Sequence, residues 1–303
     1  MSEVRAITAE RAAQIEALPI WNGPITISPL TGGISNESWL VEDAAGGHVV
    51  RIGKDFPFHH VLRERELMTA RAAEEAAFAP AVEYAGPGIM VCRHLRARTY
   101  GEADVRANIG RIAALVRAFH ETMPHHVCGP GFMFWPFHVV RDYARTLREG
   151  ESRMAPHLPS YLALANELEA VQTPLPIVFG HNDLLPANLL DDGERLWLID
   201  FEYAGFSTAM FDLAGLSSNA GFSLEESQAL LAAYFGRAPD EPLLRSLAAM
   251  QCASLLREAM WSMVSELHLD APGTDYVAYT QENLRRLDAA LDAYRTRYGH
   301  APR

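Results

Sequence analysis

The hydrophobic pattern of the first third of the chain predicts a small sheet with one long helix. Residues 7–18 have the spacing of a short amphipathic helix. Two β-rich runs, at 38–41 and 48–52, flank a Gly-containing turn and predict a hairpin. Residues 60–77 are rich in Ala, Glu, Arg and Leu without Gly or Pro, which predicts a helix. Two further strands are expected on either side of a Gly-Pro-Gly turn, at 81–84 and 89–92.

The remaining two thirds of the chain have a mainly helical pattern. Residues 102–122 predict a single helix, because their apolar positions recur on one helical face. Two short apolar runs, at 177–179 and 196–199, interrupt the helices, and each leads directly into polar residues. We therefore expect an α+β protein with a two-lobed organisation: a small β-rich lobe with one long helix over 1–95, and a larger, mainly helical lobe over 96–303. Further helices are expected at 139–149, 160–171, 223–235, 241–267 and 275–297.

Composition agrees with two lobes and excludes several classes of protein. The 303 residues are about twice the usual domain size, and 49% are hydrophobic. The three cysteines lie far apart in the sequence, which excludes a disulfide scaffold and a zinc ribbon and favours the cytoplasm. The apolar runs are shorter than the roughly 18 residues that a membrane span needs. We expect neither a signal peptide nor membrane insertion.

The charge balance indicates which partners the chain favours. There are 38 acidic and 26 basic side chains, giving a net charge of −12. A negative field repels nucleic acid and attracts a small cation. We therefore expect no nucleic-acid partner.

The segment from Gly180 to Tyr203, GHNDLLPANLLDDGERLWLIDFEY, carries the clearest chemical signal. Phosphoryl transfer needs a carboxylate that orients or deprotonates the attacking hydroxyl, and an amide oxygen and a second carboxylate that hold Mg²⁺ against the phosphates. Asp183 suits the first role, and Asn188 and Asp200 suit the second. The alternative is a polar loop followed by a structural Asp at the end of a strand. The combined spacing favours the catalytic interpretation.

The runs HNDLLPAN and LIDFEYAG resemble motifs of the choline/ethanolamine kinases, which lie within the broader aminoglycoside-phosphotransferase group and share the protein-kinase-like fold. The resemblance covers roughly residues 25–290 in matching order. It implies a two-lobed kinase for small molecules that depends on ATP and Mg²⁺. It also implies that Asp183 is the catalytic base and that Asn188 and Asp200 are the metal ligands. The implied reaction is transfer of the γ-phosphoryl group to the hydroxyl of choline or a related amino alcohol.

Two segments of the small lobe fit a nucleotide site. The turn at 30–38 has paired glycines, whose backbone N–H groups can approach phosphate oxygens, and polar donors beside them. Taken alone it is an ordinary turn, and the resemblance implies the nucleotide-phosphate loop of the family. Its candidate residues are Gly32, Gly33, Ser35 and Asn36.

The kinase arrangement also requires a cation on the third strand that pairs with an acid on the following helix. Arg51 lies on such a strand, and Arg contacts phosphate well. Glu66 is the better match for the acid, and Glu64 is the alternative. Taken singly, each of these residues could instead be a solvated surface charge.

The resemblance also implies an acceptor site. A quaternary ammonium is held by aromatic faces, at roughly 0.5–2 kcal/mol each, and by carboxylates. Tyr203, Trp261 and Tyr279 match cage positions, and Glu258, one turn before Trp261, supplies negative charge. Glu258 lies near the place of a second cage tryptophan of the family. The alternative is that Trp261 and Tyr279 are core aromatics of amphipathic helices.

Two buried polar residues are expected to support the site. His181 is expected to buttress the catalytic loop through hydrogen bonds, and Asp212 to bond to the same loop. Two alternative functions stay open: a kinase for an aminoglycoside or another hydroxylated metabolite, and a non-catalytic nucleotide-binding module. The expected partners are ATP and a small cationic amino alcohol, and a homodimer is an open expectation.

Overall fold

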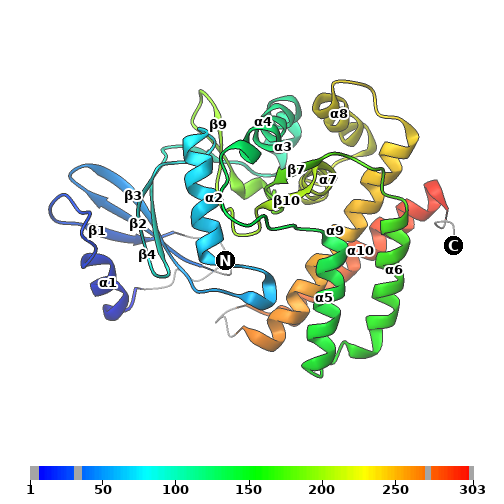
Figure 1. The fold of residues 1–303 in the computed structure, drawn as a ribbon, viewed down its shortest axis with the longest axis horizontal. Helices are drawn as coiled ribbons and strands as arrows, with labels where there is room; N and C mark the ends of the chain where they lie inside the picture. The colour runs from blue at the N-terminus through cyan, green and yellow to red at the C-terminus, as the bar shows by residue number, and fades with distance from the viewer. Residues whose placement is uncertain (1–6, 31–35, 270–273, 300–303) are drawn as a thin grey trace.

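The computed structural model describes residues 7–30, 36–269 and 274–299 (Figure 1). The small lobe is built on an antiparallel five-stranded sheet with strand order β1-β2-β3-β5-β4. The predicted hairpin is β2–β3, which pairs Glu42 with Gly47 next to its turn. The five strands are β1 (Thr26–Pro29), β2 (Glu37–Asp43), β3 (Gly46–Ile52), β4 (Val82–Gly86) and β5 (Ile89–Arg93).

The two faces of this sheet have different roles because side chains alternate along a strand. Trp39, Val50 and Val91 are buried in the small-lobe core, together with Ile15 of helix α1 (Ala9–Glu16). Arg51 alternates with Val50 and points away from this core. This alternation along β3 places Arg51 on the face where it contacts α2 and the large lobe.

Helix α2 (Arg63–Glu75) lies between the sheet and the large lobe (Figure 1). A short 3₁₀ helix, η1 (Pro57–His59), precedes it and reaches toward α9. The alanines Ala70 and Ala73 on α2 belong to the large hydrophobic core. Because α2 packs on the large lobe and also carries Glu66, it connects the two lobes at the predicted nucleotide site.

The large lobe is mainly helical, with two small antiparallel sheets, β6-β8-β9 and β7-β10. Its helices are α3 (Glu102–Ala107), α4 (Ile109–Thr122), η2 (Met123–His125), α5 (Pro136–Glu149), η3 (Ala155–His157), α6 (Leu158–Ala170), η4 (Pro186–Asn188), α7 (Ala209–Asn219), α8 (Leu224–Phe235), α9 (Glu241–His268) and α10 (Tyr276–Tyr298). Its strands are β6 (Arg98–Thr99), β7 (Ile177–Gly180), β8 (Leu189–Asp191), β9 (Leu196–Leu198) and β10 (Gly205–Thr208). The expected α+β architecture, with a small β-rich lobe that carries one long helix and a larger, mainly helical lobe, is confirmed. The division of the chain at residue 95 stays a prediction.

Two details differ from the sequence-based expectation. The single helix predicted over 102–122 is wrong: the chain forms α3 and α4, with a break at Asn108. The side chain of Asn108 donates to the carbonyl of Asp104 at 2.9 Å, an alternative to continued helical bonding that Asn readily offers. Helix α7 was not predicted, because every residue from Ala209 to Ser217 is buried and the segment has no polar face to reveal a helical period.

Helix α9 is the longest helix in the described ranges and forms the centre of the large lobe. It packs against α5, α7 and α10 and is buried along most of its 28 residues. Within the described part of the chain, no helix combines the length and apolar character needed to cross a membrane.

Candidate active site

The predicted catalytic loop connects β7 to β8 and includes η4. Asn188 is the last residue of η4, and its Nδ2 donates to the carbonyl of Asp183 at 2.9 Å. The backbone N–H of Ile199 donates to the carbonyl of Asn188 at 3.2 Å, which places Asp200 beside the same loop. The structure therefore brings Asp183, Asn188 and Asp200 together, as their spacing in the sequence predicts.

Asp212 on α7 holds this loop in place through the backbone N–H groups of the loop. Its two carboxylate oxygens accept the backbone N–H groups of His181 and Asn182, both at 2.7 Å. His120 contacts the same carboxylate at 2.8 Å. Burial opposes ionisation of Asp212, but the hydrogen bond and charge of His120 lower its pKa below the usual value. A buried carboxylate bonded to the catalytic loop is what the sequence predicted for Asp212.

His181 supports the loop from its other side. Its Nε2 contacts the carbonyl of Ile199 at 2.9 Å, and its ring packs against Phe201 with the ring centroids 5.3 Å apart. Burial lowers the pKa of His181, so the imidazole is neutral near pH 7. These contacts match the expected buttressing position.

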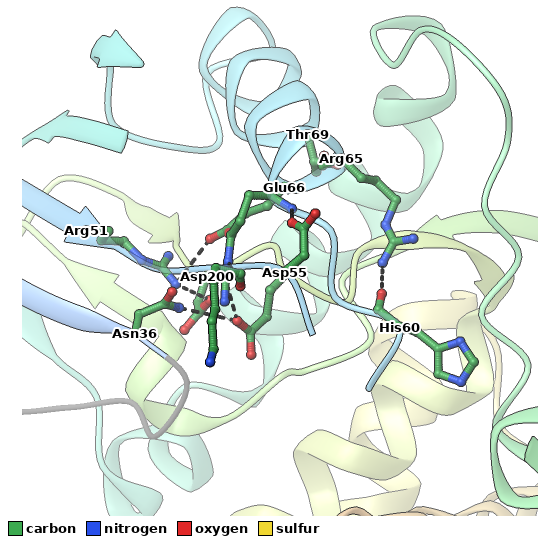
Figure 2. A network of polar contacts seen from close by, with 11 residues as sticks. Asn36, Arg51, Asp55, His60, Arg65, Glu66, Thr69 and Asp200 are labelled. Carbon is green, nitrogen blue, oxygen red and sulfur yellow. Dashed lines mark hydrogen bonds and ion pairs between the residues drawn. The ribbon is translucent and has the colours of Figure 1, made fainter. Parts of the chain in front are cut away.

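Arg51 lies at the meeting point of the two lobes (Figure 2). Its Nη2 is 2.7 Å from Oδ1 of Asp200 and 3.1 Å from Oε1 of Glu66. Glu66 is only 3% exposed and contacts Arg51, whereas Glu64 is exposed. Burial raises the pKa of Asp200, but Arg51 more than offsets this and lowers it below the usual value. Asp200 is therefore a carboxylate at neutral pH.

A second layer of charges surrounds the Arg51 cluster and was not predicted from the sequence. Arg63 contacts Glu66 at 2.5 Å and Glu202 at 3.2 Å, and Nδ2 of Asn36 donates to Glu202 at 3.3 Å. Burial and the nearby Asp200 raise the pKa of Glu202 to about 7. Their positions in the sequence were the only signal that could have indicated these two residues. Arg63 is the first residue of α2, the helix that carries Glu66, and Glu202 follows Asp200 by two residues.

A cavity of about 230 Å³ adjoins the Arg51 cluster. It is lined by Asn36, Arg51, Arg63, Glu66 and the Gly-Pro-Gly turn between β4 and β5. Of the predicted phosphate-loop residues, Asn36 therefore faces the site. Gly32, Gly33 and Ser35 lie outside the described residues.

The electrostatic surroundings of Asp183 differ from those of Asp200. Burial raises the pKa of Asp183 well above the ordinary carboxyl value, and the carboxylates of Glu258, Asp200 and Glu202 raise it further. Arg257 opposes this shift. A carboxyl group with a raised pKa accepts a proton readily, which is the property that a general base requires.

The aromatic residues predicted for the acceptor site pack tightly against one another. Tyr203 is 4% exposed and Trp261 7% exposed, and Nε1 of Trp261 donates to the Tyr203 hydroxyl at 2.9 Å. Tyr279 is exposed, and its hydroxyl donates to Glu258 at 2.8 Å. The structure thus brings these four predicted residues into one cluster.

Two further members of this cluster were missed from the sequence. His59 of η1 stacks on Trp261, with ring centroids 5.0 Å apart and an interplanar angle of 23°. The Arg257 guanidinium carbon lies 5.4 Å from the centre of the Tyr203 ring, and Arg257 pairs with Glu258 at 3.1 Å. His59 could not have been found by spacing, because it lies 202 positions before Trp261 in the sequence.

The side chains of Asn188 and Asp200 offer oxygen atoms of the kind that bind Mg²⁺. The Nδ2 of Asn188 is engaged with Asp183, which leaves the amide oxygen for a metal, and Asp200 is ionised. The described residues contain no group of three His, Cys, Asp or Glu side chains suited to holding a metal by themselves. Two oxygen ligands that are completed by phosphates and water are the usual arrangement for Mg²⁺.

These features together define the class of the protein. The antiparallel sheet, the Arg51–Glu66 pair and the mainly helical large lobe with its polar loop form a protein-kinase-like phosphotransferase fold. Comparison with known proteins agrees, because the phosphotransferase enzyme family matches residues 26–248. The chain belongs to this family.

Two curated relatives show which members of the family the chain is similar to. The chain is 31% identical to protein LicA of Haemophilus influenzae over 117 residues, which cover 37% of this chain and 41% of that protein. It is 28% identical to a probable ethanolamine kinase of Arabidopsis thaliana over 237 residues, which cover 67% of this chain and 61% of that protein. The chain therefore aligns with only about two to three fifths of the length of these curated relatives.

A solved structure agrees over almost the whole chain. A choline/ethanolamine kinase family protein of Mesorhizobium loti superposes with a TM-score of 0.76 at 26% identity. The match covers 93% of this chain and 94% of that one.

Proposed function

We propose that the protein is an ATP-dependent kinase that transfers the γ-phosphoryl group to the hydroxyl of choline or a related small amino alcohol. The observation that carries this proposal is the meeting of Asp183, Asn188 and Asp200 beside the Arg51–Glu66 pair. The names of the relatives support the amino alcohol class of acceptor.

Asp183 is the residue that acts on the acceptor. In the proposed step, the acceptor oxygen forms a bond to the γ-phosphorus as the bond from this phosphorus to the bridging β–γ oxygen breaks. The hydroxyl proton passes to the Asp183 carboxylate. Glu258, Tyr279, Tyr203 and Trp261 form the surrounding acceptor region.

The proposed binding site of the nucleotide lies between the two lobes. Arg51 contacts the phosphates and Glu66 positions Arg51, while Asn36 extends the phosphate contacts together with Gly32, Gly33 and Ser35. Asn188 and Asp200 hold Mg²⁺, which neutralises charge on the phosphates when it is bound. Catalysis then depends mainly on positioning and charge stabilisation.

The proposal is tested by measuring phosphate transfer directly. We expect purified protein with ATP and Mg²⁺ to phosphorylate one or more members of a panel of choline, ethanolamine and their methylated intermediates. Asp183→Asn should lower kcat by about 10³-fold or more, because general-base and positioning contributions are lost together. Mass spectrometry of the phosphorylated acceptor provides the readout.

A matched surface variant controls for the substitution itself. Asp192→Asn alters a carboxylate in the turn between β8 and β9, away from the cluster, and should retain wild-type turnover. Turnover by Asp183→Asn at the wild-type rate would contradict the mechanism. Phosphorylation of aminoglycosides alone would replace the acceptor class and leave the kinase assignment in place.

A further inference from the structure

The acceptor region contains a buried cation of its own. Arg257 on α9 is 5% exposed, and its guanidinium lies over the Tyr203 ring, 5.4 Å from the ring centre. This is the position in which an aromatic ring attracts a cation. The ring that the family resemblance assigns to a substrate ammonium is therefore already in contact with a charge from the protein.

Trp261 is also covered by the protein's own side chains. His59 stacks on the indole at 5.0 Å, and the rings of Tyr276 and Tyr279 meet it edge-on at 6.2 Å. The indole N–H is bonded to Tyr203. Tyr203 and Trp261 thus pack against neighbours in the way that core aromatics do, and they are only 4% and 7% exposed.

Arg257 has few partners for a buried guanidinium, which carries five N–H donors. Its one ion pair within the described residues joins Nη1 to Glu258 at 3.1 Å. Its Nε is buried and has no hydrogen-bond acceptor among the described residues. A buried charge is costly unless it is paired and hydrogen-bonded, so this guanidinium has donors available for an anion.

We propose that Arg257 binds a carboxylate of the acceptor, and that the acceptor is a zwitterionic amino alcohol carrying this carboxylate beside its amine and its hydroxyl. This inference rests on the proposed kinase function. A planar guanidinium matches the two oxygens of a carboxylate. Arg257 is one cation, with Glu258 paired to it and Asp183 nearby, and it therefore suits a singly charged anion better than a doubly charged phosphate.

The amine of the same acceptor has a counter-charge close by. Glu258 lies next to Arg257 in the sequence and contacts it, and the Tyr279 hydroxyl donates to the same carboxylate. Glu258 is therefore placed to pair with an ammonium while Arg257 pairs with the carboxylate. Choline and ethanolamine would leave Arg257 without this anion.

The experiment compares acceptors that differ only in a carboxylate. The pairs are ethanolamine with serine and 3-amino-1-propanol with homoserine, each phosphorylated by the full chain with ATP and Mg²⁺. We expect wild-type kcat/KM to be at least tenfold higher for the carboxylated member of one pair. Arg257→Met should reduce that preference by about 10- to 100-fold, the effect of losing a charge-assisted hydrogen-bonded pair.

Two further variants make the comparison specific. Arg257→Lys retains the charge without the planar fork and should show an intermediate loss of preference. Arg285→Met removes an exposed arginine on α10 that pairs with Glu282 and should leave the preference unchanged. A thermal shift induced by ATP, retained in every variant, shows that each one is folded.

The outcomes separate this inference from the proposed function. A wild-type preference for the uncarboxylated member of both pairs, or an unchanged preference in Arg257→Met, overturns the inference and leaves the kinase assignment intact. If no acceptor is phosphorylated, the proposed function fails. In that case a thermal shift by serine or homoserine that Arg257→Met abolishes still supports carboxylate binding, and the lack of any such shift in the wild type overturns it.

Discussion

The surroundings of Asp183 make its carboxylate a stronger base and at the same time make the folded state less stable. Burial and three neighbouring carboxylates raise its pKa, and Arg257 compensates for only part of this effect. Ionised Asp183 is therefore costly in the folded state, whereas the unfolded chain solvates the same charge fully. A residue of this kind is expected to reduce stability for the benefit of reactivity.

Asp183→Asn should accordingly stabilise the fold while it abolishes turnover. We expect the free energy of unfolding at pH 7.5 to rise by about 0.5–2 kcal/mol, as for other single stabilising substitutions. Thermal denaturation without nucleotide measures the change.

The same substitution at Asp192 should have the opposite effect on stability. Backbone N–H groups of Glu194 and Arg195 and the indole of Trp197 donate to this exposed carboxylate, which lowers its pKa. Asp192→Asn weakens these contacts and should lower the melting temperature. A lower melting temperature for Asp183→Asn as well would contradict the account of its environment.

The sequence predicted those site residues that lie close together along the chain. Asp183 and Asn188 are five positions apart, and a short strand leads to Asp200, so a single segment showed the cluster. His59 and Arg63 contact residues that are more than 130 positions away, at Ser265 and Glu202. Such contacts depend on how the lobes meet, which no local pattern contains.

At the scale of elements, the β2–β3 hairpin has a pH-sensitive contact. His48 on β3 lies between Glu83, at 2.6 Å from Nδ1, and Asp43, at 3.1 Å from Nε2. Burial alone would lower the pKa of His48, but these two carboxylates raise it above the ordinary value. Its contribution to stability is therefore complete below about pH 6.5, the ordinary His pKa, and is lost as the pH rises through the raised pKa.

His48→Gln should remove this pH dependence. We expect the melting temperature of the variant to fall furthest below that of the wild type near pH 6, and the difference to shrink toward pH 9. Thermal unfolding measured from pH 6 to pH 9 tests this. The exposed His125, changed to Gln, is the matched control and should show no such trend. A difference for His48→Gln that is constant with pH would contradict the role of the two carboxylates.

Apart from the break at Asn108, elements with a clear local signal in the sequence were predicted, and elements without one were not. The hairpin follows from its two β-rich runs and the Gly-containing turn between them, and α2 follows from helix propensity. Helix α7 is buried on all sides, and the short strands β6 and β8 are too brief to show a pattern. At the break at Asn108, the side chain of Asn108 bonds to the carbonyl of Asp104. The spacing of apolar residues gives no indication of such a hydrogen bond.

At the scale of the whole molecule, the lobes meet through the proposed catalytic residues themselves. Arg51 of the small lobe pairs with Asp200 of the large lobe (Figure 2). Asn36 of the small lobe donates to Glu202 of the large lobe. The segment before α2 adds a second crossing, where His59 contacts Ser265 at 2.9 Å. Because Arg51 is paired with Asp200, phosphate binding by Arg51 and metal binding by Asp200 are expected to occur together.

The measurement that tests the central claim most directly is binding of Mn²⁺, as a substitute for Mg²⁺, followed by electron paramagnetic resonance. With a non-hydrolysable ATP analogue present, we predict that the wild-type protein binds the Mn²⁺–nucleotide complex. Asp200→Asn and Asn188→Ala should each weaken this binding about tenfold or more, because each variant loses one of the two proposed protein ligands of the metal. Equal affinity for the complex in the wild type and in both variants would contradict the claim that these two side chains meet at a nucleotide-bound metal between the lobes.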